Sequence, residues 1–141
     1  MVLSVAIELP PEAWTPAVCR ELLDNVLQAH DVAQTVRDDL ALAVTEACTN
    51  AVRHASTGGV YRMEIRLDER RCVIDVCDEG PGFDPEKLDR PSAEKQGGRG
   101  LLVIRALVDH VRFRQRRPGT RLTMIKNVLS QLDEEIFPEL R

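Results

Sequence analysis

The 141 residues of this chain suffice for one two-layer core that needs no metal ion or disulfide to stabilise it. The formal net charge of −4 argues against non-specific nucleic-acid binding, and we interpret the basic stretch 112–117 as one solvated face of a strand. No run approaches the roughly 20 apolar residues of a membrane span, and residues 1–9 lack the basic start of a signal peptide. We therefore expect a single cytoplasmic domain, 1–141, without membrane or direct nucleic-acid contacts.

The first half of the chain predicts one strand followed by two helices. β-Branched residues fill 2–9 before Pro10-Pro11 ends the strand. Pro16 stands near the start of the first helix, whose apolar residues recur at the spacing of one buried face: Val18, Leu22, Leu23, Val26 and Leu27. A second helix is predicted over about 33–55, and the glycines of 57–59 end it.

The second half predicts strands, a long loop and one more helix. Strand-like patterns mark the residues 60–67, 72–77, 111–115 and 120–126. A buried helix is predicted over 100–110, and the segment 79–96, rich in Gly, Pro and charge, is expected to be a functional loop. Helices packed on one face of a mixed, mostly antiparallel sheet give an α+β two-layer sandwich.

Glu46 and Asn50 lie four residues apart on the second predicted helix, so both side chains point to the same side. Taken alone, the pair is typical of a solvated helical face. The flanking stripe is small and apolar, however, which favours a site. The amide oxygen of Asn50 suits Mg²⁺, which takes most of its other ligands from waters and phosphates. Glu46 could then accept the proton of a hydroxyl that attacks a γ-phosphate.

Asp78 ends a predicted strand and is followed by Gly80 and Gly82. Alone, this pattern is typical of a simple turn. The functional interpretation explains more of it. A carboxylate at a strand end can accept a hydrogen bond from the exocyclic amine of adenine, and the two glycines let the backbone approach the base and the ribose.

Gly97, Gly98, Arg99 and Gly100 open the third predicted helix, where free backbone N–H groups and the positive end of the helix dipole favour phosphate. The segment is no Walker A loop, because no Lys-Ser or Lys-Thr pair follows a glycine run. A flexible hinge is the alternative interpretation. Lys95 and Arg99 are the candidate charge partners of phosphates at this loop.

In order and spacing, the segments 46–50, 78–82 and 97–101 resemble the N, G1 and G2 boxes of the histidine-kinase-like (Bergerat) ATPases. This superfamily includes gyrase, sensor histidine kinases and the bacterial serine-protein kinases that act as anti-sigma factors. The resemblance covers most of 34–127 and is strongest to the anti-sigma kinases. It implies further contacts to the nucleotide from Arg53, His54, Leu101 and Thr120, the last through a hydroxyl that supports the aspartate of the G1 box.

The resemblance also implies a function. Such a kinase uses ATP and Mg²⁺, binds a sigma factor in one state, and phosphorylates a serine or threonine of a small anti-anti-sigma (STAS-type) protein in the other. We expect a homodimer. Gln96 stands where some members carry an arginine that contacts the γ-phosphate, which bears on the transfer rate. Two alternatives stay open: a nucleotide-gated binding module with little or no kinase activity, and a switch kinase of a signalling scaffold.

Overall fold

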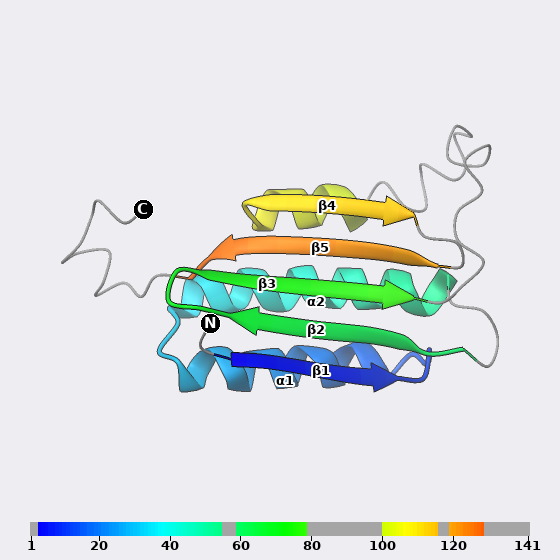
Figure 1. Cartoon of the computed structure of the whole chain (residues 1–141), viewed down its shortest axis with the longest axis horizontal. Helices are drawn as coiled ribbons and strands as arrows, with labels where there is room; N and C mark the ends of the chain where they lie inside the picture. Colours follow the sequence, from blue (N-terminus) through cyan, green and yellow to red (C-terminus); the bar gives the residue numbers. More distant parts are fainter. Residues whose placement is uncertain (1–2, 55–58, 79–99, 116–118, 129–141) are drawn as a thin grey trace.

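The computed structural model describes residues 3–54, 59–78, 100–115 and 119–128. Its strands form one five-stranded sheet in the order β1-β2-β3-β5-β4, with every neighbouring pair antiparallel (Figure 1). The elements are β1 (Leu3–Leu9), α1 (Thr15–Ala29), α2 (Gln34–His54), β2 (Tyr61–Leu67), β3 (Arg71–Asp78), β4 (His110–Gln115) and β5 (Thr120–Asn127). Residues 100–107 are also helical. The predicted α+β class, with helices on one face of the sheet, is confirmed (Figure 1).

The alternation of apolar and polar residues along the strands determines which face of the sheet packs against the helices. In β2 the buried residues are Tyr61, Met63, Ile65 and Leu67, and the residues between them are exposed or half-buried. Successive side chains of a strand point to opposite faces, so a shift of one residue would turn this apolar row toward solvent. Full burial of a side chain such as Ile65 contributes about 1.5–3 kcal/mol, which makes that shift costly.

The helices α1 and α2 cover the same face of the sheet (Figure 1). α1 buries Leu23 and Leu27, and Pro16 lies in its first turn, where no intrahelical hydrogen bond is lost. α2 buries the small residues Ala43 and Ala47, which let the helix lie close to β3 (Figure 1). Within the described residues, no helix is long and apolar enough to cross a membrane.

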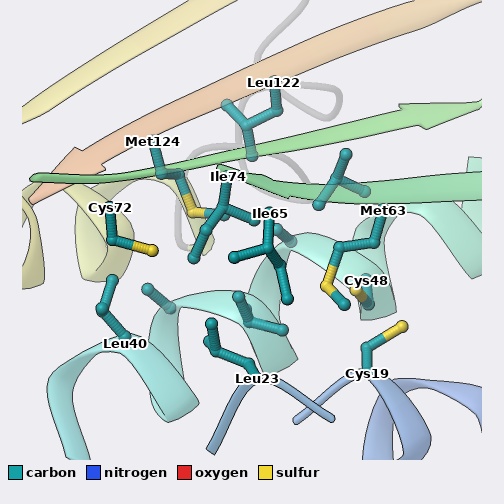
Figure 2. Packing of buried hydrophobic residues seen from close by; sticks show 14 of the residues in the cluster. Cys19, Leu23, Leu40, Cys48, Met63, Ile65, Cys72, Ile74, Leu122 and Met124 are labelled. Atoms are coloured by element: carbon teal, nitrogen blue, oxygen red, sulfur yellow. The ribbon is translucent and has the colours of Figure 1, made fainter. Parts of the chain in front are cut away.

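Branched aliphatic and sulfur-containing side chains fill the space between the sheet and these helices. Figure 2 shows Ile65, Ile74 and Met124 of the sheet pointing toward Leu23 and Leu40 of the helices. All of these side chains are almost fully buried. Because close-packed interiors resist displacement, this core fixes the positions of the strand ends that carry the candidate site.

One predicted boundary is wrong, because the helix expected over 100–110 ends at 107. The backbone N–H of Asp109 donates to the carbonyl of Ile125, and His110 already pairs with Ile125 in the sheet. Pairing with β5 therefore replaces the last predicted helical turn. The predicted loop 79–96 and the segment 129–141 lie outside the described residues.

Candidate functional site

Several elements reach the same end of the molecule. β3 ends at Asp78, β5 begins at Thr120, and these two residues pair across the sheet. α2 ends at His54 on the same side, next to the end of β3 (Figure 1). The antiparallel order of β3 and β5, together with the direction of α2, thus gathers predicted site residues from distant parts of the sequence.

Asp78 and Thr120 form a buried polar pair at this end. The Thr120 hydroxyl donates a hydrogen bond to Oδ2 of Asp78, and each residue is only 8% exposed. Gly119, with a φ of 111°, takes a backbone conformation that side chains rarely adopt, and it directs the chain into β5 at Thr120. A buried carboxylate needs hydrogen-bond partners, and Thr120 supplies one. The contact of Asp78 with adenine stays a prediction.

His54, the last residue of α2, interacts electrostatically with the Asp78 carboxylate. Burial lowers the pKa of His54, the Asp78 carboxylate acts in the opposite direction, and the neighbouring Arg53 charge lowers the pKa further. This influence of Asp78 agrees with the position of the end of α2 beside the end of β3 (Figure 1). Arg53 itself is exposed in the last turn of α2. The lowered pKa favours the uncharged imidazole, and a contact of His54 with the nucleotide stays a prediction.

Asn50 and Glu46 meet the first described residue of the helical segment 100–107. A Cβ atom added to Gly100 would lie 2.8 Å from Nδ2 of Asn50, 3.5 Å from its Oδ1 and 3.5 Å from Oε2 of Glu46. Only a glycine lets the backbone approach these two side chains so closely. The structure thus brings together two predicted site residues of α2 and one of the glycine segment. Leu101 follows Gly100 and packs against the core.

A buried network that the sequence reasoning missed supports this end of the sheet. Tyr61 pairs with Asp78, and its hydroxyl donates to Oγ1 of Thr15 at 2.7 Å. The Thr15 hydroxyl donates in turn to the carbonyl of Glu12 at 2.8 Å, which ties the start of α1 to the sheet. Burial raises the pKa of Tyr61 well above its usual value. Its signal in the sequence was a tyrosine in a core-facing strand position, because a buried tyrosine hydroxyl needs a partner.

The remaining predicted site residues cannot be placed in the same way. Six of them lie outside the described residues: Gly80, Gly82, Lys95, Gly97, Gly98 and Arg99. Gln96 belongs to the same segment. The described residues therefore show where the α2 and strand residues of the candidate site lie, and the roles of all the predicted site residues stay predictions.

The described residues hold no group of three or more His, Cys, Asp or Glu side chains that could bind a metal ion by themselves. An all-protein metal site is thus not found in this part of the chain. The Asn50 amide beside Gly100 offers an oxygen ligand without a crowding side chain, and the Glu46 carboxylate lies on the same side of α2. Such a small oxygen set fits Mg²⁺, which is usually bound by one or two protein groups together with phosphates and waters.

Comparison with known proteins gives three findings. Residues 9–126 match the family described as "Histidine kinase-like ATPase domain". The chain is 30% identical over 135 residues to the serine-protein kinase RsbW of Bacillus subtilis, covering 86% of this chain and 84% of that protein. It is 32% identical over 99 residues to an anti-sigma F factor of Clostridium acetobutylicum, covering 63% of this chain and 68% of that protein.

Solved structures show the same fold. The crystal structure of the RsbU and RsbW domains of a Mycobacterium tuberculosis protein matches with a TM-score of 0.67 and 21% identity, covering 89% of this chain and 32% of that one. A histidine kinase domain from Erythrobacter litoralis matches with a TM-score of 0.53 and 13% identity, covering 80% of this chain and 61% of that one. At these identities the likeness concerns the fold.

Proposed function

Because the chain belongs to the histidine kinase-like ATPase family, we propose that it is an ATP-dependent serine/threonine-protein kinase that also acts as an anti-sigma factor. The observation that carries this proposal is the close approach of Gly100 to Asn50 and Glu46. It brings a candidate metal ligand and a candidate base to a helical segment whose preceding glycines suit phosphate binding. Relatives named serine-protein kinase and anti-sigma F factor support the same activity.

In the proposed site, Asp78 accepts a hydrogen bond from the exocyclic amine of adenine. Thr120 holds the carboxylate in place through its hydroxyl. Guanine carries an oxygen where adenine carries this amine, so an acceptor at Asp78 selects ATP over GTP. We further propose that Lys95 and Arg99 contact the phosphates, as their place beside the glycine segment suggests.

Asn50 is the proposed protein ligand of Mg²⁺. Its amide oxygen is a hard ligand of the kind that this ion accepts. The absence of a side chain at Gly100 fits this role, because a Cβ there would lie 2.8 Å from the amide nitrogen and displace the group. Bound at this position, the ion would offset the negative charge of the phosphates during transfer.

Glu46 is the proposed base. Its carboxylate lies on the same side of α2 as Asn50, and Oε2 would stand 3.5 Å from a Cβ at Gly100. The proton of the attacking serine or threonine hydroxyl passes to Glu46 while the hydroxyl oxygen bonds to the γ-phosphorus. The bond from that phosphorus to the β,γ-bridging oxygen breaks, and ADP leaves with the electron pair.

We propose a sigma factor and a STAS-type anti-anti-sigma protein as the partners, and a homodimer as the assembled form. The names of the relatives, serine-protein kinase RsbW and anti-sigma F factor, support a protein substrate and a sigma-factor partner. They favour a kinase over a binding module without activity. Sedimentation of the purified chain with and without ATP tests the dimer.

The proposal is tested with γ-labelled ATP, Mg²⁺ and an anti-anti-sigma protein from the same genome. We expect label on a serine or threonine of that protein, located by mass spectrometry, and none on His54 or any other histidine of this chain. Tight ATP binding without any label transfer, while a sigma factor is still bound, would make the chain a binding module and contradict the kinase proposal.

Two variants separate the roles on α2. Glu46→Gln keeps size and polarity but removes the base, so we expect unchanged ATP affinity and phosphotransfer slowed by roughly 10²- to 10⁴-fold. Asn50→Ala should weaken Mg²⁺-dependent ATP binding as well as the rate. Asp38→Asn is the matched control, since it changes an exposed acid of the same helix to its amide. Identical profiles for the two site variants would contradict the assigned roles.

A further inference from the structure

The sheet face opposite the helices is uncovered by any described element, and its two halves differ in charge. Directly paired residues of neighbouring strands point to the same side, so the register assigns each side chain to a face. On β1 and β2 this face carries two acids and two arginines in balance: Glu8, Glu64, Arg62 and Arg66. On β4 and β5 it carries arginines but no acid within either strand.

We call the residues Arg112, Arg114 and Arg121 the arginine patch. Arg114 pairs directly with Arg121, and Arg112 pairs with Thr123 two positions further along. Like charges placed directly opposite each other on a sheet are destabilising. A sheet face that served only as a solvent-exposed surface would avoid paired like charges by alternating acidic and basic residues, as the β1–β2 half does.

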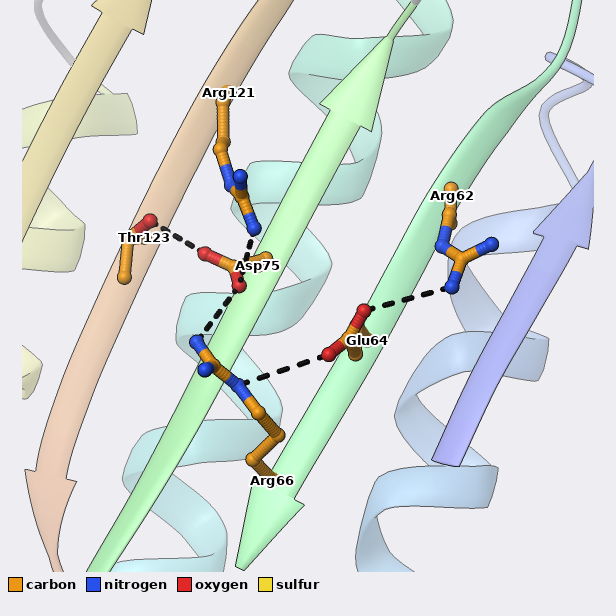
Figure 3. Close-up of polar contacts among 6 residues, drawn as sticks. All are labelled: Arg62, Glu64, Arg66, Asp75, Arg121 and Thr123. Atoms are coloured by element: carbon orange, nitrogen blue, oxygen red, sulfur yellow. Dashed lines mark hydrogen bonds and ion pairs between the residues drawn. The ribbon is translucent and has the colours of Figure 1, made fainter. Parts of the chain in front are cut away.

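Asp75, the buried acid of this face, pairs with one member of the patch, Arg121, and shares its charge with Arg66. Asp75 accepts from Arg121 and from Arg66, each at 3.1 Å, and it also accepts from Thr123 (Figure 3). Within the described residues, no ion pair joins Arg112 or Arg114 to a carboxylate, and both are exposed. The patch is therefore a positive surface on a chain whose net charge is −4.

We propose that the arginine patch is a docking surface for an acidic segment of a protein partner. Guanidinium groups bind carboxylates in a planar, two-bonded geometry, and their weak hydration suits protein interfaces. Arg121 lies on the other side of the sheet from α1 and α2 (Figure 3), and the register places Arg112 and Arg114 on the same face. The patch is therefore separate from the Asn50–Gly100 contact, and the proposal stands whether or not the chain is a kinase.

A protein partner fits this face better than nucleic acid does. By the register of the paired strands, Glu64 and Glu8 lie on the same face as the patch, so a continuous phosphate backbone that crossed the sheet would meet like charges. Among the described strand residues, this face also offers no Phe, Tyr or Trp ring for bases to stack on, because Phe113 pairs with Leu122 on the helix side. Discrete carboxylates of a protein segment can pair with the patch and avoid both acids.

The test uses a fluorescein-labelled peptide of alternating glutamate and glycine, titrated with the full chain and followed by anisotropy. We expect binding that weakens with salt, as exposed charges are screened. The double variant Arg112→Glu/Arg114→Glu should weaken it by at least about tenfold, because like charges then face the peptide. The control Arg20→Glu/Arg105→Glu makes the same charge change at exposed positions of the helical segments and should have little effect.

Equal weakening in both double variants, or no peptide binding by the wild type, would overturn the proposal. A DNA duplex or phosphatidylserine vesicles that bind more tightly than the peptide, in a manner that depends on the patch, would also overturn it. The same holds if sedimentation shows that the patch variant dissociates a dimer, because the face would then join two copies. Unchanged melting temperature and ATP affinity of the patch variant establish that it still folds.

Discussion

Two buried aspartates on β3 stand three residues apart and face opposite sides of the sheet. Asp75, on the open face, is 2% exposed and accepts hydrogen bonds from Arg66, Arg121 and Thr123 (Figure 3). Asp78, on the helix face, is 8% exposed and accepts from the hydroxyl of Thr120. Asp75 is thus bonded to guanidinium groups of two neighbouring strands, whereas the hydrogen bond described for Asp78 comes from a hydroxyl.

This difference in hydrogen-bond partners indicates a structural role for Asp75 and a ligand-binding role for Asp78. Two guanidinium groups compensate the charge of Asp75 and connect β3 to β2 and β5. The Thr120 hydroxyl orients Asp78 at the end of β3, and a charged acceptor makes the stronger hydrogen bonds to a ligand. We therefore expect the loss of Asp75 to cost stability and the loss of Asp78 to cost ATP affinity.

The largest effect on ATP affinity is expected for Asp78→Asn. The amide can turn a donor toward the adenine amine, and a lost hydrogen bond to a charged group is worth about 10- to 100-fold in affinity. Calorimetric titration with ATP and Mg²⁺ measures it, with Asp75→Asn as the matched control on the same strand. Equal ATP affinities for wild type and Asp78→Asn would remove Asp78 from the adenine site.

Asp75→Asn should destabilise the fold while leaving ATP affinity unchanged. The substitution leaves Arg66 and Arg121 without their shared carboxylate, so we expect the free energy of unfolding to fall by about 1–3 kcal/mol. Urea unfolding at neutral pH measures the change. If Asp75→Asn had the same free energy of unfolding as the wild type, the ion pairs of Asp75 with the two arginines would contribute no net stability.

The stability contributed by Asp75 should depend on pH. Burial alone would raise the pKa of Asp75, but the hydrogen bonds from Thr123 and Arg121 and the charges of Arg121 and Arg66 outweigh it and lower the pKa. The stabilisation is then complete above the unfolded pKa of about 3.9 and is lost as the pH falls through the lower folded-state value. The stability gap between wild type and Asp75→Asn should shrink in acid; a gap that widened below this pKa would reverse the assignment.

A smaller effect on binding is expected for Gly100→Ala. The added Cβ must displace the Asn50 amide, so we expect ATP affinity to fall by about three- to tenfold. Thermal stability should not fall in step, because alanine is the better helix former. In the Asn50→Ala background the same substitution should have no further effect on affinity, and independent, additive losses would show that the close approach is irrelevant to the site.

The fold was largely predictable because local patterns dominate it. Apolar alternation marked β2 most clearly, and the buried stripes of α1 and α2 followed their helical spacing. The partners of Asp75 were not predictable in this way. Arg121 and Thr123 lie 46 and 48 residues further along the chain, and they reach Asp75 only because β5, rather than β4, pairs with β3.

Less of the candidate site than of the fold could be predicted from the sequence. The spacing of Glu46 and Asn50 placed both on one side of α2, but their approach to Gly100 depends on how the segment 100–107 packs. Thr120 was reached through family resemblance, since nothing local links a threonine after a turn to an aspartate 42 residues earlier. Local pattern thus predicts elements, whereas contacts between distant elements depend on topology.

The central claim is that a nucleotide binds where β3 ends, beside α2 and the segment 100–107. A crystal structure of the chain with Mg²⁺ and a non-hydrolysable ATP analogue tests it most directly. We predict the adenine amine within hydrogen-bonding distance of the Asp78 carboxylate, the metal ion on the amide oxygen of Asn50, and the γ-phosphate within reach of Glu46. A nucleotide bound elsewhere, or one bound at this end without contact to Asp78 and Asn50, would contradict the account.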